Sequence, residues 1–341
     1  ADYWPIPFAD GGRAWALANL SKGEIDIAAE FGVSTPGHDL AQLKVNRMVG
    51  MLDYRGMNVR YMPQMPELEG VSGKARYDNG MLRFDIAAGT ASGLRTSGTT
   101  IVLSGLADPP PHHASIRMPI TGPAQDVIRF LARPKLGLPK DVLYDYRRLG
   151  GDVSVDLSLD FPLLNALTVS DLDIKAEATL TKFSLRDAIG DVDLSDMTAQ
   201  VKYANSELSI AGNGKLDGSP VEITWRSLFG ARVAFRQRYD VKGTIPAALI
   251  AKAGLPSPEP WLKGPIATTL QYQVAPNGSS EIVGRFEIKG AQASAPPLDW
   301  TKEPGIDGQV LMTAKLAPGG KVQTIDYEAR LAGDRSGPFR Q

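Results

Sequence analysis

The sequence predicts an all-β protein made of repeated antiparallel strands with a few short helices. Three observations support this prediction. Apolar and polar residues alternate along most of the chain, glycine and proline are frequent at 35 and 25 of 341 residues, and segments with helical spacing are short. A period of two places successive side chains on opposite faces of a strand. Glycine and proline supply the turns that connect many strands.

The first part of the chain contains a helix and several strands. Residues 10–20 read as a short helix around Trp15, and Ile25 to Phe31 alternate as a strand. Val71 to Tyr77 and Met81 to Ala87 flank Asp78-Asn79-Gly80, whose Asn-Gly pair suits a type I′ hairpin turn. Further strands are expected at 57–61, 98–103 and 115–120, and a helix at 123–132.

The segment from Gly150 to Trp225 has the clearest alternation. Every odd position from Val153 to Phe161 is apolar, and the even positions are small-polar or acidic. Similar runs follow, and Asp217-Gly218 between two of them is a strong hairpin signal. This part of the chain is expected to be an antiparallel meander with a continuous apolar face. None of its residues suggests chemistry.

The remaining chain repeats this organisation. Strands are expected at Val233 and Phe235, at 241–245, 266–274, 282–288, 310–316 and 325–331, with a short helix at 246–253. Two segments match in sequence: Tyr77, Asn79 and Leu82 keep the spacing of Tyr203, Asn205 and Leu208. Pro123-Ala124 and Pro246-Ala247 each open a helix, and Gly-Leu-Pro follows at 137–139 and 254–256. The shared order indicates duplication, and repeats that stack through strand edges predict an elongated body.

Composition and motifs argue against several classes of function. The formal net charge is −1 with charges spread evenly, so a nucleic-acid surface is not expected, and cysteine is absent. His112-His113 follows three prolines and is interpreted as a solvated loop, because a metal site needs more ligands. The acidic pairs Asp171/Asp173 and Asp191/Asp193 are interpreted as the wet face of strands. The protein is predicted to be no enzyme, with no cofactor and no metal site.

Three stretches resemble the AsmA-like family of bacterial envelope proteins, in the large branch that includes YhdP, with TamB more distant. The residues that carry the resemblance are Trp4-Pro5 with Arg13-Ala14-Trp15 and Gly23-Glu24-Ile25; Leu52 to Tyr61, Met65-Pro66, Val71-Ser72-Gly73 and Leu82; and Val221 to Trp225, Phe229 and Arg236 to Gly243. The resemblance implies an elongated, twisted antiparallel sheet curled into a hydrophobic groove. It also implies an inner-membrane anchor, which this sequence lacks, so a fragment of a longer periplasmic protein is expected.

The function expected from the resemblance is lipid transfer. The groove would bind phospholipid acyl chains and conduct them between the inner and outer membranes of a diderm bacterium. The membranes would be reached through parts outside this chain, and envelope protein partners remain open. The residues expected to line the groove are Val153, Val155, Leu157, Leu159, Ile174, Ala176, Ala178, Met197, Val201, Ile223, Leu270 and Phe286.

The alternative is a closed β-sandwich, an interaction or adhesion module of the envelope without lipid transport. A long apolar face must be covered, either by a second sheet or by a ligand. Small residues expected in inward registers, Ala176, Ala178, Ala199, Ala211 and Ala314, favour the groove over a closed core. The repeats divide the chain at 1–149, 150–260 and 261–341, the last being partial.

Overall fold

The computed structural model describes residues 10–35, 44–136, 145–164, 167–168, 171–230, 232–254, 259–295, 300–331 and 339–340. Two compact units are present. Unit 1 comprises Ala1–Tyr146 and Val153–Ala176, and unit 2 comprises Arg147–Asp152 and Glu177–Gln341. The expected division into three repeats stays a prediction.

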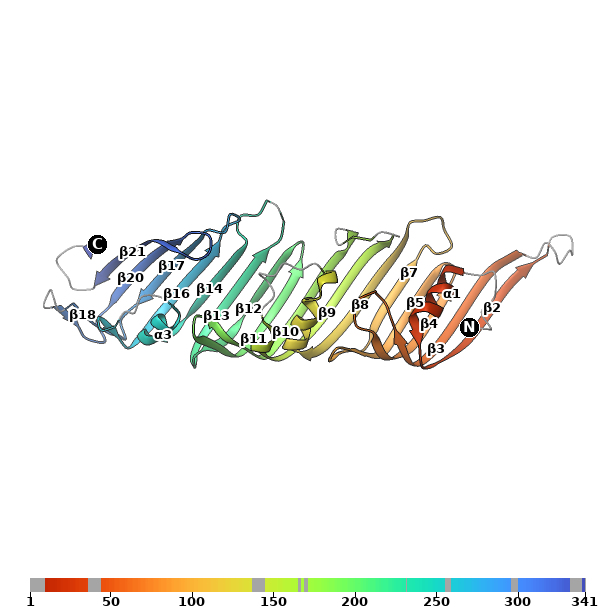
Figure 1. Ribbon diagram of the computed structural model, residues 1–341, viewed down its shortest axis with the longest axis horizontal. Coiled ribbons are helices and arrows are strands. Elements are labelled where there is room, and N and C mark those ends of the chain that lie inside the picture. Colours follow the sequence, from red (N-terminus) through yellow and green to blue (C-terminus); the bar gives the residue numbers. More distant parts are fainter. Residues whose placement is uncertain are drawn as a thin grey trace. The chain divides into compact units, whose positions relative to one another are not determined.

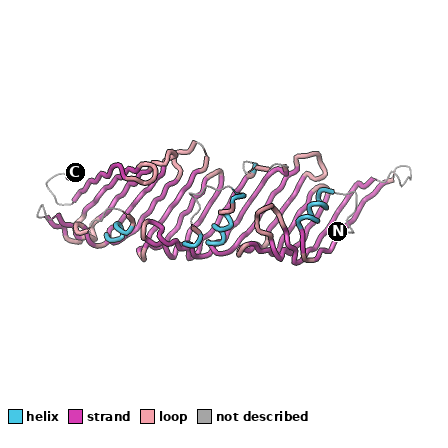
Figure 2. The backbone as a smooth tube through the Cα atoms, viewed as in Figure 1, coloured by secondary structure: helices cyan, strands magenta, loops and turns pink. Residues whose placement is uncertain are grey.

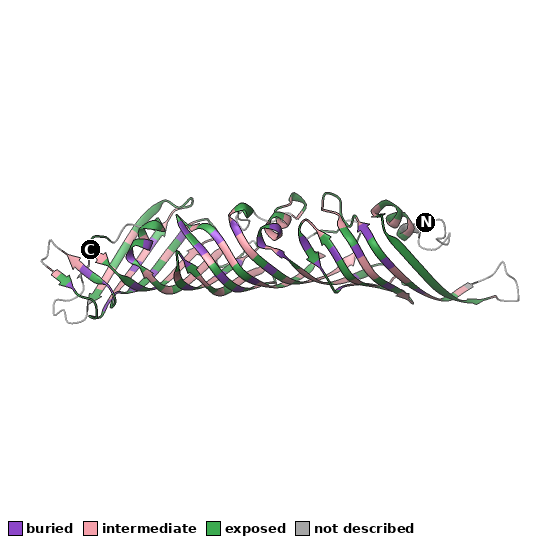
Figure 3. Ribbon diagram, turned by 90° about the horizontal axis from the view of Figure 1, so that it is seen from below, coloured by how far each residue is buried: buried purple, intermediate pink, exposed green. Residues whose placement is uncertain are grey.

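Strands dominate both units, and helices are few and short (Figures 1 and 2). The helices are α1 (Asp10–Asn19), α2 (Ala124–Leu131) and α3 (Ala247–Lys252), with 3₁₀ turns at Pro134–Leu136 and Tyr146–Arg148. In each unit the helices lie on one side of the strands (Figure 3). The predicted class, an all-β antiparallel chain with few helices, is confirmed.

In unit 1 the pairings run β2–β3–β4–β5–β7–β8, all antiparallel. The short β1 pairs with β3, and β6 pairs with both β5 and β8. The strands are β1 (Leu20–Ser21), β2 (Glu24–Ser34), β3 (Lys44–Val59), β4 (Leu68–Asp78), β5 (Met81–Ala91), β6 (Leu94–Thr96), β7 (Thr99–Ser104) and β8 (His112–Pro123). The boundary between the units falls within β9 (Leu149–Leu163) and β10 (Asp173–Ile189).

In unit 2 eight strands pair in the order β11–β12–β13–β14–β16–β17–β20–β21, again antiparallel. These are β11 (Val192–Ala204), β12 (Glu207–Leu216), β13 (Ser219–Leu228), β14 (Gln237–Pro246), β16 (Pro265–Val274), β17 (Ser280–Glu287), β20 (Gly308–Leu316) and β21 (Val322–Leu331); β22 (Phe339–Arg340) pairs with β21. A second, three-stranded sheet consists of β15 (Leu262–Lys263), β18 (Gln292–Ala295) and β19 (Trp300–Lys302).

Both predicted hairpin turns have the backbone that their residues favour. Asn79 and Gly80 have φ of 44° and 82°, and Asp217 and Gly218 have φ of 43° and 82°. Two consecutive positive φ values define the type I′ turn, which matches the twist of the flanking strands. The local sequence therefore fixes these two strand reversals.

The matching sequence segments occupy equivalent positions. Tyr77 pairs across the strands with Leu82, and Tyr203 pairs in the same way with Leu208. Pro123 and Pro246 each end a strand and cap the following helix, with φ of −62° and −70°. The Gly-Leu-Pro matches fall largely outside the described residues, as does the Trp4-Pro5 pair.

A β-bulge keeps the apolar side chains of β11 on one face. Buried residues occupy even positions at Val192 and Leu194 and odd positions at Met197 and Ala199. The change occurs at Asp196, whose φ is 51°, where the register to β12 shifts between Ser195 and Thr198. Because a bulge inserts one extra residue, it reverses the parity without reversing the face.

Two local predictions are wrong. His112 and His113 do not lie in a solvated loop but begin β8, where a ring nitrogen of His112 lies 2.8 Å from the carbonyl oxygen of Gly105. Val233 and Phe235 do not form a strand; they lie in the connection between β13 and β14. The Phe235 ring instead faces the guanidinium of Arg226 at 5.8 Å.

Candidate functional site: the apolar face of unit 2

Cross-strand partners in unit 2 form continuous rows across eight strands. Residues directly opposite each other in an antiparallel pair project from the same face of the sheet. The aliphatic row consists of Ala199, Gly212, Ile223, Val241, Leu270, Gly284, Met312 and Tyr327. The aromatic row lies beside it, two residues away on every strand, toward the connection between β13 and β14. It consists of Val201, Ile210, Trp225, Tyr239, Tyr272, Ile282, Ala314 and Ile325.

A third row lies on the other side of the aliphatic row. This Phe286 row consists of Gly214, Val221, Gly243, Thr268, Phe286, Val310 and Ala329. The three rows together are called the apolar face. Thr268, whose hydroxyl donates to the carbonyl of Ile266 at 3.2 Å, is a polar residue within the Phe286 row. Its hydrogen bond reduces the cost of burying that hydroxyl.

The opposite face of the same strands is polar. A row there runs Asn213, Glu222, Lys242, Thr269, Arg285, Leu311 and Glu328. Ion pairs join its neighbours, including Arg238 with Asp240 at 3.0 Å and Arg226 with Glu207 at 2.8 Å. Hydrogen bonding to Glu207 raises the pKa of Arg226 above its usual value, so this cation keeps its charge. The two faces therefore differ sharply in polarity.

One end of the apolar face is covered by other segments of unit 2. Ala247 of α3 packs with Ile266, Phe286 and Met312, and Ala293 of the small sheet belongs to the same buried cluster. Ile223, Val241 and Leu270 of the aliphatic row, by contrast, are only half-buried. Tyr327 at the end of the row is 46% exposed. Surface remains on the apolar face for a further apolar partner.

The structure places four of the predicted lining residues within these rows: Val201, Ile223, Leu270 and Phe286. Met197 faces the same side, because a Cβ on Gly214 would meet both Met197 and Leu194 at 3.1 Å. Ala211 does not lie there. It pairs with Gln200 and Thr224 on the polar face, since its neighbour Ile210 occupies the apolar register.

The remaining predicted residues lie on β9 and β10. Val153, Val155 and Leu157 are less exposed than the intervening Asp152, Ser154 and Asp156. Leu159 is half-buried, and so are Ile174, Ala176 and Ala178, which alternate with the exposed residues Asp173, Lys175 and Glu177. This pattern gives each strand one apolar side. Whether these side chains bind acyl chains stays a prediction.

The strands β2 to β8 of unit 1 have an apolar face of their own, which contains none of the predicted lining residues. One of its rows consists of Ile27, Leu52, Ala75, Phe84, Ile101 and Ile116. Ile27 and Val33 on β2 are 62% and 53% exposed. The alternation of Ile25 to Phe31 was the available signal, but it did not reveal which residues of other strands would continue the row.

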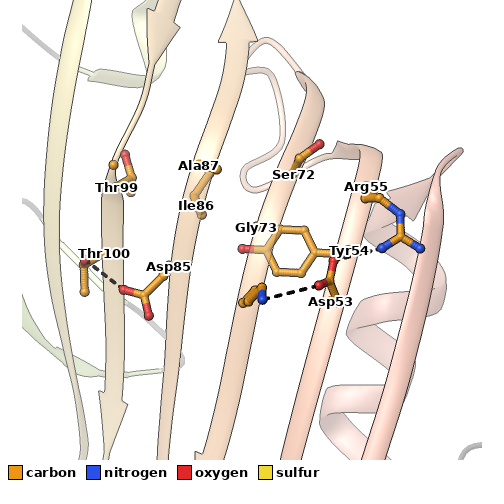
Figure 4. Close-up of a pocket in the computed structure, with 12 residues that line it drawn as sticks. Asp53, Tyr54, Arg55, Ser72, Gly73, Asp85, Ile86, Ala87, Thr99 and Thr100 are labelled. Atoms are coloured by element: carbon orange, nitrogen blue, oxygen red, sulfur yellow. Dashed lines mark hydrogen bonds and ion pairs between the residues drawn. The ribbon is translucent and has the colours of Figure 1, made fainter.

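An open hollow lies over β3, β4, β5 and β7 of unit 1 (Figure 4). Its charged side chains have partners: Lys74 pairs with Asp53 at 3.8 Å, and Asp85 accepts a hydrogen bond from the hydroxyl of Thr100 at 3.3 Å. Hydrogen bonding to Arg83 lowers the pKa of Asp85 below its usual value, so the carboxylate stays ionised. A general acid or base needs a pKa near the working pH, which this carboxylate lacks.

The described residues contain no cluster of three or more metal-ligating His, Cys, Asp or Glu side chains. Among them, no helix is long and apolar enough to cross a membrane.

Comparison with known proteins gives one match. The model of a family described as YhdP protein matches residues 1–334. Searches of the curated proteins and of the solved structures found no match.

Proposed function

The chain belongs to the YhdP family, and from this premise we propose that it is a segment of a bridge-like lipid-transfer protein. Its apolar faces bind phospholipid acyl chains and conduct them between the inner and outer membranes of a diderm bacterium. The segment works in the periplasm as a binding surface without catalysis. Other parts of the full-length protein anchor it in the inner membrane and reach the outer membrane.

The observation that carries this proposal is the continuity of the rows in unit 2. The aliphatic row crosses eight strands with apolar residues or glycine at every position except Tyr327, while the opposite face is charged. The two glycines in the row are covered by neighbouring apolar groups: a Cβ on Gly212 would meet the Cβ of Ala199 at 2.5 Å, and one on Gly284 would meet the ring of Phe286 at 2.6 Å. An acyl chain can therefore move from strand to strand without crossing a charged side chain.

The free energy of burying the acyl chains is large enough to retain a lipid without contacts to its head group. Each CH₂ group removed from water contributes about 0.8 kcal/mol, so a chain of about 16 carbons contributes on the order of 10 kcal/mol when fully buried. Partial burial on one face of a sheet reduces this figure. Head-group contacts are therefore not required for binding, which suits a surface along which lipids move.

The test is lipid extraction and mass spectrometry on the protein purified in mild detergent. Leu270→Glu places a charge in the aliphatic row and is expected to abolish co-purifying phospholipid. Thr269→Glu is the matched control. It lies one residue earlier on the polar face, where Thr269 pairs with Lys242 and Arg285.

Two outcomes decide the proposal. Phospholipid in the wild type and in Thr269→Glu, but not in folded Leu270→Glu, supports it. The absence of lipid from well-folded wild-type protein contradicts it and favours the alternative, an interaction module whose apolar faces are closed by protein.

A further inference from the structure

Polarity changes stepwise along the strands on the apolar face of unit 2. The Phe286 row lies nearest α3, and its members Phe286 and Val221 are buried, 7% and 4% exposed. The aliphatic row and then the aromatic row follow. Beyond them lies a fourth row, called the mixed row, which contains Leu208, Ser227, Gln237, Val274, Ser280, Leu316 and Val322. The end of the face opposite α3 therefore mixes polar and apolar side chains.

Three amphipathic aromatic side chains form the border between the apolar and the mixed rows. Trp225 stacks on Tyr239 with ring centroids 5.7 Å apart, and Tyr239 lies 5.8 Å from Tyr272. The Tyr239 hydroxyl donates to Oε1 of Gln237, in the mixed row, at 3.0 Å. This hydrogen bond shows that the polar edge of the Tyr239 ring points away from the aliphatic row. Tryptophan and tyrosine are favoured where an apolar and a wet environment meet.

The loops beyond the mixed row carry only positive charge. They comprise residues 205–206, 229–236, 275–279 and 317–321, and their sequences contain Arg232, Arg236 and Lys321 but no Asp or Glu. Arg232 and Lys321 are exposed. At the opposite ends of the strands both signs of charge occur: Lys252 of α3 pairs with Asp217, the amide of Asp191 donates to the carbonyl of Lys252, and Lys263 is exposed. The loop end next to the aromatic row is therefore the end that attracts an anion.

From this arrangement we infer that unit 2 holds a glycerophospholipid in one orientation. The acyl chains lie over the half-buried aliphatic row with their methyl ends toward the covered Phe286 row. The glycerol ester groups lie level with Trp225, Tyr239 and Tyr272, and the phosphate lies beside the loops that carry Arg232 and Lys321. This inference rests on the proposed function and adds the orientation of the lipid across the strands.

The physical basis is the match of two polarity gradients. Ester groups are intermediate in polarity between acyl chains and phosphate, and the amphipathic tryptophan and tyrosine rings of the border are intermediate in the same sense. A phosphodiester carries a negative charge that exposed Arg and Lys side chains attract over a Debye length of about 8 Å at physiological salt. The reverse orientation would place ester oxygens against the buried Phe286 row, and it would place the phosphate at the end where acidic and basic side chains occur together instead of at the end that carries only positive charge.

Trp225 offers a direct measurement of this orientation. In a variant with Trp4, Trp15, Trp261 and Trp300 replaced by Phe, Trp225 is the only fluorescent tryptophan. Phosphatidylcholine with bromines near the glycerol end of its acyl chains is compared with an isomer carrying bromines near the methyl end. Bromine quenches tryptophan at short range. Stronger quenching by the glycerol-end isomer is expected.

The outcomes separate the two proposals. Equal quenching by both isomers, or stronger quenching by the methyl-end isomer, overturns the inferred orientation but leaves lipid binding intact. If neither isomer quenches while circular dichroism shows the variant to be folded, lipid does not bind at this face, and the inference fails together with the proposed function. The titration is repeated with a second variant in which the same four tryptophans are replaced by Tyr. Agreement between the two variants excludes an effect of the Phe substitutions on folding.

Charge substitution tests the phosphate end independently. Arg232→Gln combined with Lys321→Gln is expected to weaken binding of phosphatidylglycerol about threefold at low salt, the size of two exposed ion pairs. Lys263→Gln, an exposed lysine in β15 at the other end of the strands, is the control and is expected to have no effect. A loss of equal size in the control overturns the assignment of the phosphate to the loop end.

Discussion

The hydroxyl of Tyr54 on β3 lies against Gly73, its cross-strand partner on β4 (Figure 4). A Cβ atom on Gly73 would come within 2.7 Å of Tyr54 Oη and within 2.2 Å of the carbonyl oxygen of Asp85. An aromatic ring that lies over a cross-strand glycine restores the packing that the missing side chain cannot supply. The pair therefore needs glycine at position 73.

Gly73→Ala is expected to destabilise the protein by about 2 kcal/mol, because an added methyl group in a filled site forces the backbone or the ring to move. Urea unfolding measures this change. Gly50→Ala is the matched control, since a Cβ there meets only the Cβ of Tyr77 at an ordinary 3.7 Å. Equal stability of the two variants would show that the ring does not require this glycine.

Tyr54→Phe is expected to leave the stability unchanged or to raise it slightly. Tyr54 Oη is buried and has no hydrogen-bond partner among the described residues. An unpaired buried hydroxyl costs free energy, and its removal recovers that cost. A loss of about 1 kcal/mol or more in urea unfolding would instead indicate a hydrogen bond to a bound water.

Alkaline pH provides a second test of the same residue. Burial, together with the nearby charge of Asp85, raises the pKa of Tyr54 from 10.0 to about 12. The unfolded chain therefore loses this proton first, so the contribution of Tyr54 is complete below pH 10 and is lost as pH rises through about 12. The urea midpoint of the wild type is expected to fall more steeply over this range than that of Tyr54→Phe.

Lys302→Met is expected to destabilise unit 2 by about 3 kcal/mol, because it leaves buried carbonyl groups unpaired. Lys302 is 2% exposed, and its ammonium donates to the carbonyls of Ile288 and Ala291, both at 2.8 Å, and of Glu303 at 3.2 Å. Lys289→Met is the control. Its partner is Asp307 in an exposed ion pair, which contributes at most about 1 kcal/mol.

Acid is expected to release α3 from the hairpin turn of β12 and β13. Lys252 pairs with Asp217, and this hydrogen bond, followed by one from the amide of Asp193, lowers the pKa of Asp217 below 3.8. The contact is therefore present above pH 3.8 and is lost as pH falls through the lowered value. Hydrogen exchange at the Ala253 amide, which donates to Leu249, reports the change.

Asp217→Asn is expected to remove this pH dependence. The variant keeps an oxygen that can accept from the amide of Asp193 but loses the charge that attracts Lys252. Exchange at Ala253 should then be fast at every pH. If exchange in the variant stays as slow as in the wild type, the ion pair does not hold α3 in place.

Predictions from the sequence succeeded where neighbouring residues decide the conformation. Asn79-Gly80 and Asp217-Gly218 adopt positive φ at low cost, so their turns followed from two residues each. Pro123 and Pro246 were predicted to open helices, and the structure places each at the N-cap, where the fixed φ of proline suits the extended residue that ends the strand and precedes the first turn.

Predictions were wrong or could not be made where residues distant in the sequence decide the conformation. The bulge at Asp196 places an ordinary residue in the left-handed region, and only pairing with β12 makes that necessary. The contact of Trp225 with Tyr239 and Tyr272 depends on the register of three strands, which alternation within one strand does not specify. The prolines before His112 suggested a loop, but β8 begins at that residue because it pairs with β7.

The rows of the apolar face run across the strands, so the number of hairpins sets their length and the length of the strands sets their width. Neighbouring strands lie about 4.8 Å apart, and each additional hairpin therefore extends a row by about 10 Å. Strands such as β12, β13 and β14, with 10 residues each, keep the width constant. Duplication of a hairpin-coding stretch would lengthen the apolar face without changing its width, so its length can evolve independently of its width.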